Sequence, residues 1–193
     1  MNKISDLLSE KLKKEMLLDD IGALKIEYAL TVLKNEGTKL ILLFLFYLYF
    51  GQEKLFVFCA ILLIPVRIFS GGLHMKTNVT CFLFSFFFFL MAIKVLPLLP
   101  ISMFGYALLL VFSLIIICVC APIATSKKPI VTREKYLWCK RMAVASSLVM
   151  GCFLLLQIKD NPTFQSGVWV FTLQAFQLMI AYMYQKSKGG SFI

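Results

Sequence analysis

The chain has 193 residues, of which 60% are hydrophobic and 16% are charged, and its formal net charge at pH 7 is +10. Soluble domains contain about 45–50% apolar residues. The excess here lies in long apolar runs, so the composition excludes an ordinary soluble domain and favours one membrane domain. No nucleic-acid-binding motif is visible, and a bias of positive charge toward the cytoplasmic side explains the net charge better than nucleic-acid binding does.

The N-terminal region, residues 1–36, is highly charged and has no continuous apolar run of the kind found in a signal peptide, so we expect it to be retained. Its apolar residues recur at steps of three and four, as on one face of a helix. We therefore predict an N-terminal amphipathic helix that either lies on the membrane surface or packs on the protein's own cytoplasmic loops. The apolar positions are Ile4, Leu8, Leu12, Leu17, Ile21, Leu24 and Tyr28.

Six apolar segments follow, and they predict an all-α, polytopic protein with six transmembrane helices. The last three have the length of ordinary spans, whereas the first three are shorter than the roughly 20 residues that a straight span needs. The short helices either thin the bilayer locally or, in the case of the first two, form a re-entrant hairpin. The segments are residues 39–50, 55–69, 81–93, 103–121, 142–158 and 167–184.

The basic residues set the predicted orientation. If the N-terminus is cytoplasmic, every Lys and Arg except Lys54, Lys94 and Lys159 lies on the cytoplasmic side, as the positive-inside rule requires. We therefore predict that both termini are cytoplasmic. The predicted parts are an interfacial arm at 1–36, a six-helix membrane domain at 37–185 and a cytoplasmic tail at 186–193.

The loop between the second and third apolar segments carries the candidate chemistry. It contains His74, the single histidine of the chain, and it leads to Cys81. A cysteine acts as a nucleophile in its thiolate form, and a neighbouring imidazole can generate the thiolate and later protonate the leaving amine. Seven residues of continuous helix separate two side chains by about 10 Å, so the dyad requires that the loop, or residues 77–80, depart from helix. By the predicted topology, this site lies at the cytoplasmic interface.

Other residues near this loop are candidates for supporting roles. Gly71 and Gly72 permit the chain to leave the helix, and their N–H groups can point at an oxyanion, although a plain turn explains the pair equally well. Arg67 is costly at a membrane edge unless it is paired or reaches the surface. It is therefore either an interface anchor or a clamp for a substrate carboxylate or carbonyl. Cys139 is the next candidate nucleophile, since it has basic neighbours but no base.

The six cysteines are scattered along the chain, with no CxxC pair and no histidine cluster. This pattern favours neither a disulfide framework nor a zinc site. We expect no metal and no other cofactor.

The pattern Arg67-x3-Gly71-Gly72-x-His74-x6-Cys81, in a six-segment membrane protein of this size, closely resembles the accessory gene regulator B (AgrB) family. The resemblance covers nearly the whole chain and includes the charged arm and a Pro-containing basic stretch at residues 121–129. Members of that family are membrane cysteine endopeptidases of Gram-positive bacteria. They process a small precursor peptide, AgrD, into a cyclic quorum-sensing pheromone.

The resemblance implies that Cys81 is the nucleophile, that His74 is its base, and that Arg67 and Gly72 are required. Cleavage of the precursor's C-terminal tail would leave the peptide as a thioester on the enzyme, and a Cys or Ser of the peptide would then close a thiolactone or lactone ring. It further implies a location in the bacterial cell membrane, an AgrD-like precursor as partner, and a homodimer.

Residues 127–141 carry six positive charges against the single negative charge of Glu134. An acidic precursor tail, which the family's substrates tend to have, would be attracted to this stretch. Alternatively, the charges serve only to fix the orientation of the chain. The candidate tail-binding residues are Lys127, Lys128, Arg133 and Lys135.

Two other classes of protein compete with a cysteine peptidase. A non-enzymatic membrane protein, such as a peptide exporter or an immunity protein, would use His74 and Cys81 only for packing. The predicted spans carry few ionisable residues, which weakens a transporter. A membrane protease of another mechanism would need a motif such as HExxH or GxSxG, and neither occurs in the sequence.

Overall fold

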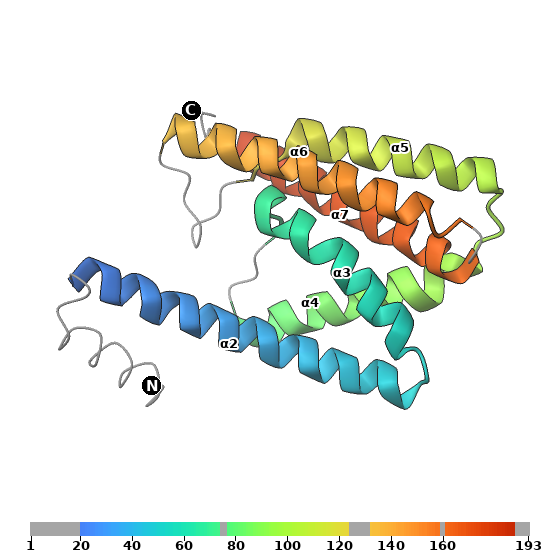
Figure 1. The fold of residues 1–193 in the computed structure, drawn as a ribbon, viewed down its shortest axis with the longest axis horizontal. Helices are drawn as coiled ribbons and strands as arrows, with labels where there is room; N and C mark the ends of the chain where they lie inside the picture. The colour runs from blue at the N-terminus through green and yellow to red at the C-terminus, as the bar shows by residue number, and fades with distance from the viewer. Residues whose placement is uncertain (1–19, 74–76, 124–131, 159–160, 188–193) are drawn as a thin grey trace. The chain divides into compact units, whose positions relative to one another are not determined.

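The computed structural model describes residues 20–73, 77–123, 132–158 and 161–187. All secondary structure in these ranges is helical, which confirms the predicted all-α class (Figure 1). Six α-helices correspond to the six predicted apolar segments, and α4 continues into a π-helical turn, η1, and a 3-10 turn, η2. The elements are α2 (Asp20–Tyr49), α3 (Glu53–Ser70), α4 (Asn78–Leu90), η1 (Met91–Val95), η2 (Leu96–Leu98), α5 (Met103–Cys120), α6 (Arg133–Leu155) and α7 (Asn161–Ser187).

The chain divides into two compact units, residues 1–50 and residues 51–193. The first unit contains α2, which runs without a break through Gly37, between the predicted arm and the first apolar segment. Local side-chain bonds support the helix there: Lys39 Nζ donates to Glu36 Oε1 at 2.7 Å, and Thr38 Oγ1 donates to the Lys34 carbonyl at 2.8 Å. The predicted amphipathic helix lies partly outside the described residues, and the domain boundary at residue 36 stays a prediction.

Among the described residues, four helical stretches are long and apolar enough to cross a membrane, as expected for a membrane protein. They are Asn78–Leu98, Met103–Cys120, Arg133–Leu155 and Pro162–Ser187. The third apolar segment, predicted as a short helix at 81–93, is part of a stretch of 21 residues. It is longer because the helix begins at Asn78 and because η1 and η2 carry it to Leu98.

The helices α2 and α3 do not belong to this group, since each has several charged residues. Within its 18 residues, α3 contains Glu53, Lys54 and Arg67. The more apolar half of α2 still contains Glu36 and Lys39. The prediction of six spans with both termini cytoplasmic therefore stays a prediction.

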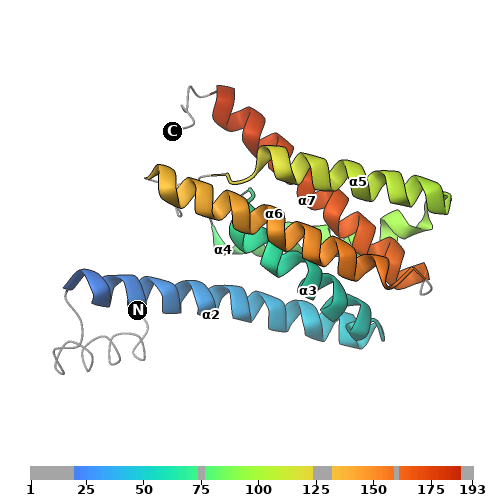
Figure 2. The same cartoon turned by 45° about the horizontal axis from the view of Figure 1, so that its top comes forward.

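In the second unit, α7 is the central helix. It packs against α3, α5 and α6, and 61% of its apolar span is buried, compared with 28% for each of the other three candidate spans. Figures 1 and 2 show α5, α6 and α7 running side by side. Gly167 permits the closest approach, because a Cβ at this position would clash with Leu154 of α6 and contact Leu62 of α3. Small residues allow helices to pack closely in membranes in the same way.

Successive helices in the second unit run in opposite directions along the bundle. As a result, the end of α3, the start of α4, the end of α5, the start of α6 and the end of α7 all gather on one side, the left side in Figure 1. An edge-to-face contact between Phe69 and Trp138, with ring centroids 5.5 Å apart, joins the end of α3 to the first turns of α6 on this side. Arg67, Gly71 and Gly72 at the end of α3 and Cys81 at the start of α4 lie there as well.

Candidate functional site

The candidate site begins where α3 ends. The N–H of Gly71 donates to the carbonyl of Arg67 at 3.0 Å and closes the last turn of the helix. Gly71 itself has φ 78° and ψ −152°, a backbone conformation that is open essentially only to glycine. The chain turns at this residue because no Cβ is present.

The segment that follows α5 docks on this turn. The N–H of Ile123 donates to the carbonyl of Ser70 at 3.0 Å. A Cβ on Gly71 would lie only 2.7 Å from the carbonyl oxygen of Ile123. Gly71 therefore serves two purposes: it supplies the unusual backbone conformation, and it lets a second segment approach closely.

Arg67, in the last turn of α3, donates hydrogen bonds to a side chain of α7 and to the main chain after α3. Its Nη1 donates to Gln177 Oε1 at 3.1 Å and its Nη2 donates to the carbonyl of Leu73 at 3.5 Å. These two hydrogen bonds help to orient the guanidinium. A charged group at membrane depth needs such partners, and an oriented guanidinium can still bind a carboxylate or carbonyl oxygen.

Two glutamines of α7, Gln174 and Gln177, complete this part of the site. Gln174 Nε2 donates to Ser70 Oγ at 3.1 Å and to the carbonyl of Gly71 at 3.0 Å. Both glutamines are buried, with 1% and 4% of their surface exposed. The sequence analysis did not identify them, although a signal was present. Two amides one helical turn apart in an otherwise apolar span need hydrogen-bond partners inside the protein.

Gly72 is buried next to this network. A Cβ there would contact Gln177 Oε1 at 3.6 Å and Gln174 Nε2 at 3.9 Å, so both amides face this glycine. The N–H of Gly71 is used by the helix end, whereas the N–H of Gly72 makes no hydrogen bond within the part of the chain that the structure describes. Of the two N–H groups predicted to bind an oxyanion, only that of Gly72 stays a candidate.

Cys81 lies in the first turn of α4. Thr77 caps this helix, because its Oγ1 accepts a hydrogen bond from the N–H of Thr80 at 3.2 Å. The N–H of Cys81 donates to the Thr77 carbonyl at 3.1 Å, and the cysteine is only 7% exposed.

The chain departs from helix at residues 71–73 of the loop and again at Thr77, which is extended at φ −110° and ψ 156°. Residues 78–80 are helical, so the predicted departure over 77–80 is correct only for its first residue. From Thr77 to Cys81 the helix rises about 6 Å, and three extended residues before Thr77 reach up to about 11 Å. The chain is therefore long enough to bring His74 back over Cys81. His74 itself lies outside the described residues.

The predicted tail-binding residues are only partly within the described ranges, since Lys127 and Lys128 lie outside them. Arg133 and Lys135 are exposed in the first turn of α6, which Thr132 caps by accepting a hydrogen bond from the Lys135 N–H at 3.3 Å. This turn lies on the same side of the bundle as Arg67 and the start of α4 (Figure 1). Cys139, the alternative nucleophile, is buried one turn further along α6 and is 1% exposed.

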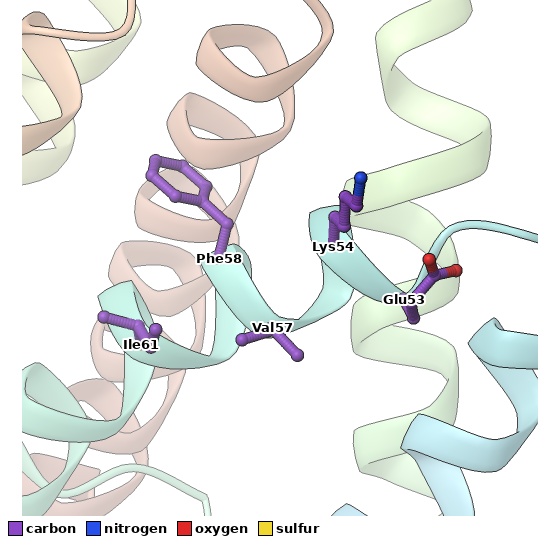
Figure 3. Close-up of a pocket in the computed structure, with 5 residues that line it drawn as sticks. All are labelled: Glu53, Lys54, Val57, Phe58 and Ile61. Atoms are coloured by element: carbon purple, nitrogen blue, oxygen red, sulfur yellow. The ribbon is translucent and has the colours of Figure 1, made fainter.

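A surface hollow at the other end of α3 does not belong to this site. Figure 3 shows its lining residues, which all come from the first turns of that helix. The distance along the helix axis from Glu53 to Arg67 is about 21 Å. The hollow is lined mainly by apolar side chains, and its residues are Glu53, Lys54, Val57, Phe58 and Ile61.

The Gly71→Ala variant is expected to lower the midpoint of thermal unfolding in detergent, measured by tryptophan fluorescence. The substitution adds a strained backbone conformation, worth about 1–3 kcal/mol, to a clash with the Ile123 carbonyl. Gly51→Ala is the matched control, because Gly51 also has positive φ, at 65°, but has open space around it. If the two variants unfold at the same temperature, the close approach of Ile123 contributes nothing to stability.

The fold and the site together define a helical membrane protein with a buried cysteine at a helix start and an oriented arginine on the same side of the bundle. The chain belongs to the accessory gene regulator B family, whose model matches residues 1–178. This match confirms the resemblance seen in the sequence. Membership of the family implies a role in quorum sensing.

Individual relatives agree with this assignment. The accessory gene regulator protein B of Staphylococcus carnosus is 27% identical over 192 residues, which cover 95% of each chain. A putative AgrB-like protein of Clostridium perfringens is 27% identical over 185 residues, covering 88% of this chain and 81% of the relative. A putative AgrB-like protein of Clostridium beijerinckii is 32% identical over 108 residues, and this chain spans about half of it, 54%. No solved structure matches the chain.

Proposed function

We propose that this protein is a membrane cysteine endopeptidase that removes the C-terminal tail of an AgrD-like precursor peptide and leaves the peptide as a thioester on Cys81. Intramolecular cyclisation then releases a thiolactone or lactone pheromone. The observation that carries this proposal is the position of Cys81. It lies in the first turn of a capped helix, is shielded from water, and occupies the cysteine position of the family's sequence pattern.

In the first half of the proposed reaction, His74 accepts the proton of the Cys81 thiol. The thiolate attacks the scissile carbonyl carbon and forms a tetrahedral oxyanion, toward which the N–H of Gly72 is the candidate donor. When the intermediate collapses, the carbon–nitrogen bond breaks, and the departing amine takes the proton from His74. The products of this half-reaction are the free tail and the Cys81 thioester.

In the second half, a thiol or hydroxyl of the bound peptide attacks the thioester and closes the ring, and the Cys81 thiol is regenerated. Water competes for the same thioester. A tethered nucleophile in good orientation has an effective concentration far above molar, up to about 10⁵–10⁸ M. The burial of Cys81 further limits access of water. Exchange of one thioester for another is nearly balanced in bond energy, so removal of the tail or the product has to draw the reaction forward.

The charge on this side of the bundle supports the capture of an acidic precursor tail. Arg133 and Lys135 are exposed at the start of α6, and Lys127 and Lys128 precede them in the sequence. Attraction between exposed charges weakens with salt. If tail capture is correct, the KM for the precursor rises as the salt concentration rises, and a KM that is independent of salt would argue against it.

Mass spectrometry of the intact protein during turnover of a cognate AgrD-like precursor tests the function directly. The expected result is a covalent adduct equal in mass to the precursor without its tail, less one water, and located on the peptide that contains Cys81. The adduct should disappear on treatment with hydroxylamine, which cleaves thioesters. Tail cleavage without any adduct would rule out acyl-enzyme chemistry, and export of an uncut precursor would favour the non-enzymatic class.

A further inference from the structure

Two buried side chains of α7 keep polar atoms that nothing in the described part of the chain binds. These atoms are Gln174 Oε1 and Gln177 Nε2. The two side chains are 1% and 4% exposed. Buried polar atoms in native proteins are nearly always hydrogen-bonded, so an unpaired acceptor and an unpaired donor side by side call for an explanation.

Each amide has one atom that is hydrogen-bonded, and this atom identifies which group of the amide is unpaired. Gln174 Nε2 is the donor to Ser70 Oγ and to the Gly71 carbonyl, so its oxygen is the remaining group. Gln177 Oε1 is the acceptor for Arg67 Nη1, so its amino group is the remaining group. The hydrogen-bond network thus determines the orientation of both amides.

Both amides face Gly72. A Cβ there would contact Gln177 Oε1 at 3.6 Å, Arg67 Cζ at 3.8 Å and Gln174 Nε2 at 3.9 Å. Because Gly72 has no side chain, only main-chain atoms of this residue lie against the two amides. Glycine is the residue that allows another backbone to approach closely.

We propose that Gln174 and Gln177 bind the main chain of the substrate peptide. Gln174 Oε1 accepts a hydrogen bond from one peptide N–H, and Gln177 Nε2 donates one to a peptide carbonyl. An extended peptide presents an N–H and a carbonyl from the same residue on one edge, and recognition through these groups does not depend on side chains. This inference rests on the proposed function, because it assigns a binding site for the peptide beside the catalytic motif.

The same arrangement gives Gln177 a second task. It holds the Arg67 guanidinium at 3.1 Å, so a peptide that binds the free amino group of Gln177 lies next to the oriented arginine. The amides place the peptide beside the arginine, whose orientation Gln177 helps to fix. Gln174 and Gln177 are positioning residues for the reaction at Cys81.

The test measures binding in the absence of cleavage. Full-length protein with Cys81→Ala is placed in lipid nanodiscs, and the Kd of a fluorescently labelled synthetic AgrD-like precursor is measured by anisotropy. Adding Gln174→Met should weaken binding by about 2- to 10-fold, as expected for the loss of one hydrogen bond. Gln165→Met is the matched control, because Gln165 is a half-buried glutamine on the same helix, about 14 Å along the axis, and it should leave the Kd unchanged.

A series of precursors in which single peptide bonds are replaced by esters separates binding from mere structural support. Each ester removes one N–H from the peptide. At one position the ester should weaken binding to the Cys81→Ala protein and have no further effect when Gln174→Met is also present. If no ester in the series weakens binding to the Cys81→Ala protein, the proposal is overturned, and the unpaired atoms hold water instead. The result that overturns the proposal is measured on the Cys81→Ala protein alone, so a folding defect in Gln174→Met cannot hide it.

The outcome is also separable from the proposed function. If the ester pattern is observed but no acyl adduct ever forms, the proposed peptide-binding site stands and the proposed peptidase function fails. If the adduct forms but every ester weakens binding equally with and without Gln174→Met, the proposed peptidase function stands and the proposed peptide-binding site fails.

Discussion

Replacement of Cys81 by alanine is expected to abolish precursor cleavage, with a loss on the order of 10⁴-fold or more, because no other group can form the thioester. Coexpression with the precursor, followed by detection of the released tail, measures this loss. The variant should still bind the precursor and should unfold at the same temperature as the unsubstituted protein, since a methyl group replaces a small thiol at a buried helix start.

The control for this result is Cys139→Ala. Cys139 is also buried in a helix on the same side of the bundle, and it is the second candidate nucleophile of the chain. It should retain full cleavage. If cleavage survives Cys81→Ala at equal protein levels, or is lost with Cys139→Ala alone, Cys81 is not the nucleophile.

The His74→Ala variant is expected to lower kcat for tail cleavage by about 10²–10⁴-fold, the usual contribution of a general acid and base. The variant should also slow alkylation of Cys81 by iodoacetamide, since the thiolate would no longer be generated by a neighbouring imidazole. The Kd for the precursor should be unchanged. These three measurements distinguish a loss of proton transfer from a loss of binding.

Asn78→Ala is a suitable companion to His74→Ala. Asn78 is exposed in the first turn of α4, between His74 and Cys81, so it reports on any general disturbance of the segment. We expect normal cleavage and normal alkylation from it. If the His74→Ala variant cleaves as fast as the Asn78→Ala variant, His74 is not the base for Cys81, and the loop serves only for packing.

The existence of the helices could be predicted from the apolar segments, and so could the bounds of α5, predicted at 103–121 and found at Met103–Cys120, but the starts of the helices with charged or polar first turns could not. Both α6 and α7 begin earlier than the apolar pattern indicates. For α6 the difference is nine residues, from the predicted 142 to Arg133. Hydrophobic periodicity does not report on the charged turns of a helix. The capping residue does, since Thr132 and Thr77 each accept a hydrogen bond from the N–H three residues later.

The candidate site could be predicted only where its residues are neighbours in the sequence. Arg67, Gly71 and Gly72 belong to one short motif, and the structure places all three at one turn. Gln174 lies 104 residues from its partner Ser70, and Gln177 lies 110 residues from Arg67. Which helices become neighbours depends on packing around α7, and the apolar pattern of a single sequence contains no information on that choice.

The hydrogen bond between Ile123 and Ser70 has a consequence for how the peptide is handled. Ile123 is the last described residue before the basic stretch, and Ser70 lies four residues before His74. Two loops that are distant in the sequence, one carrying positive charge and the other carrying the histidine, therefore depart from a shared junction. If the proposed tail capture is correct, the segments that lead to the tail-binding residues and to the catalytic motif start from one hydrogen-bonded junction.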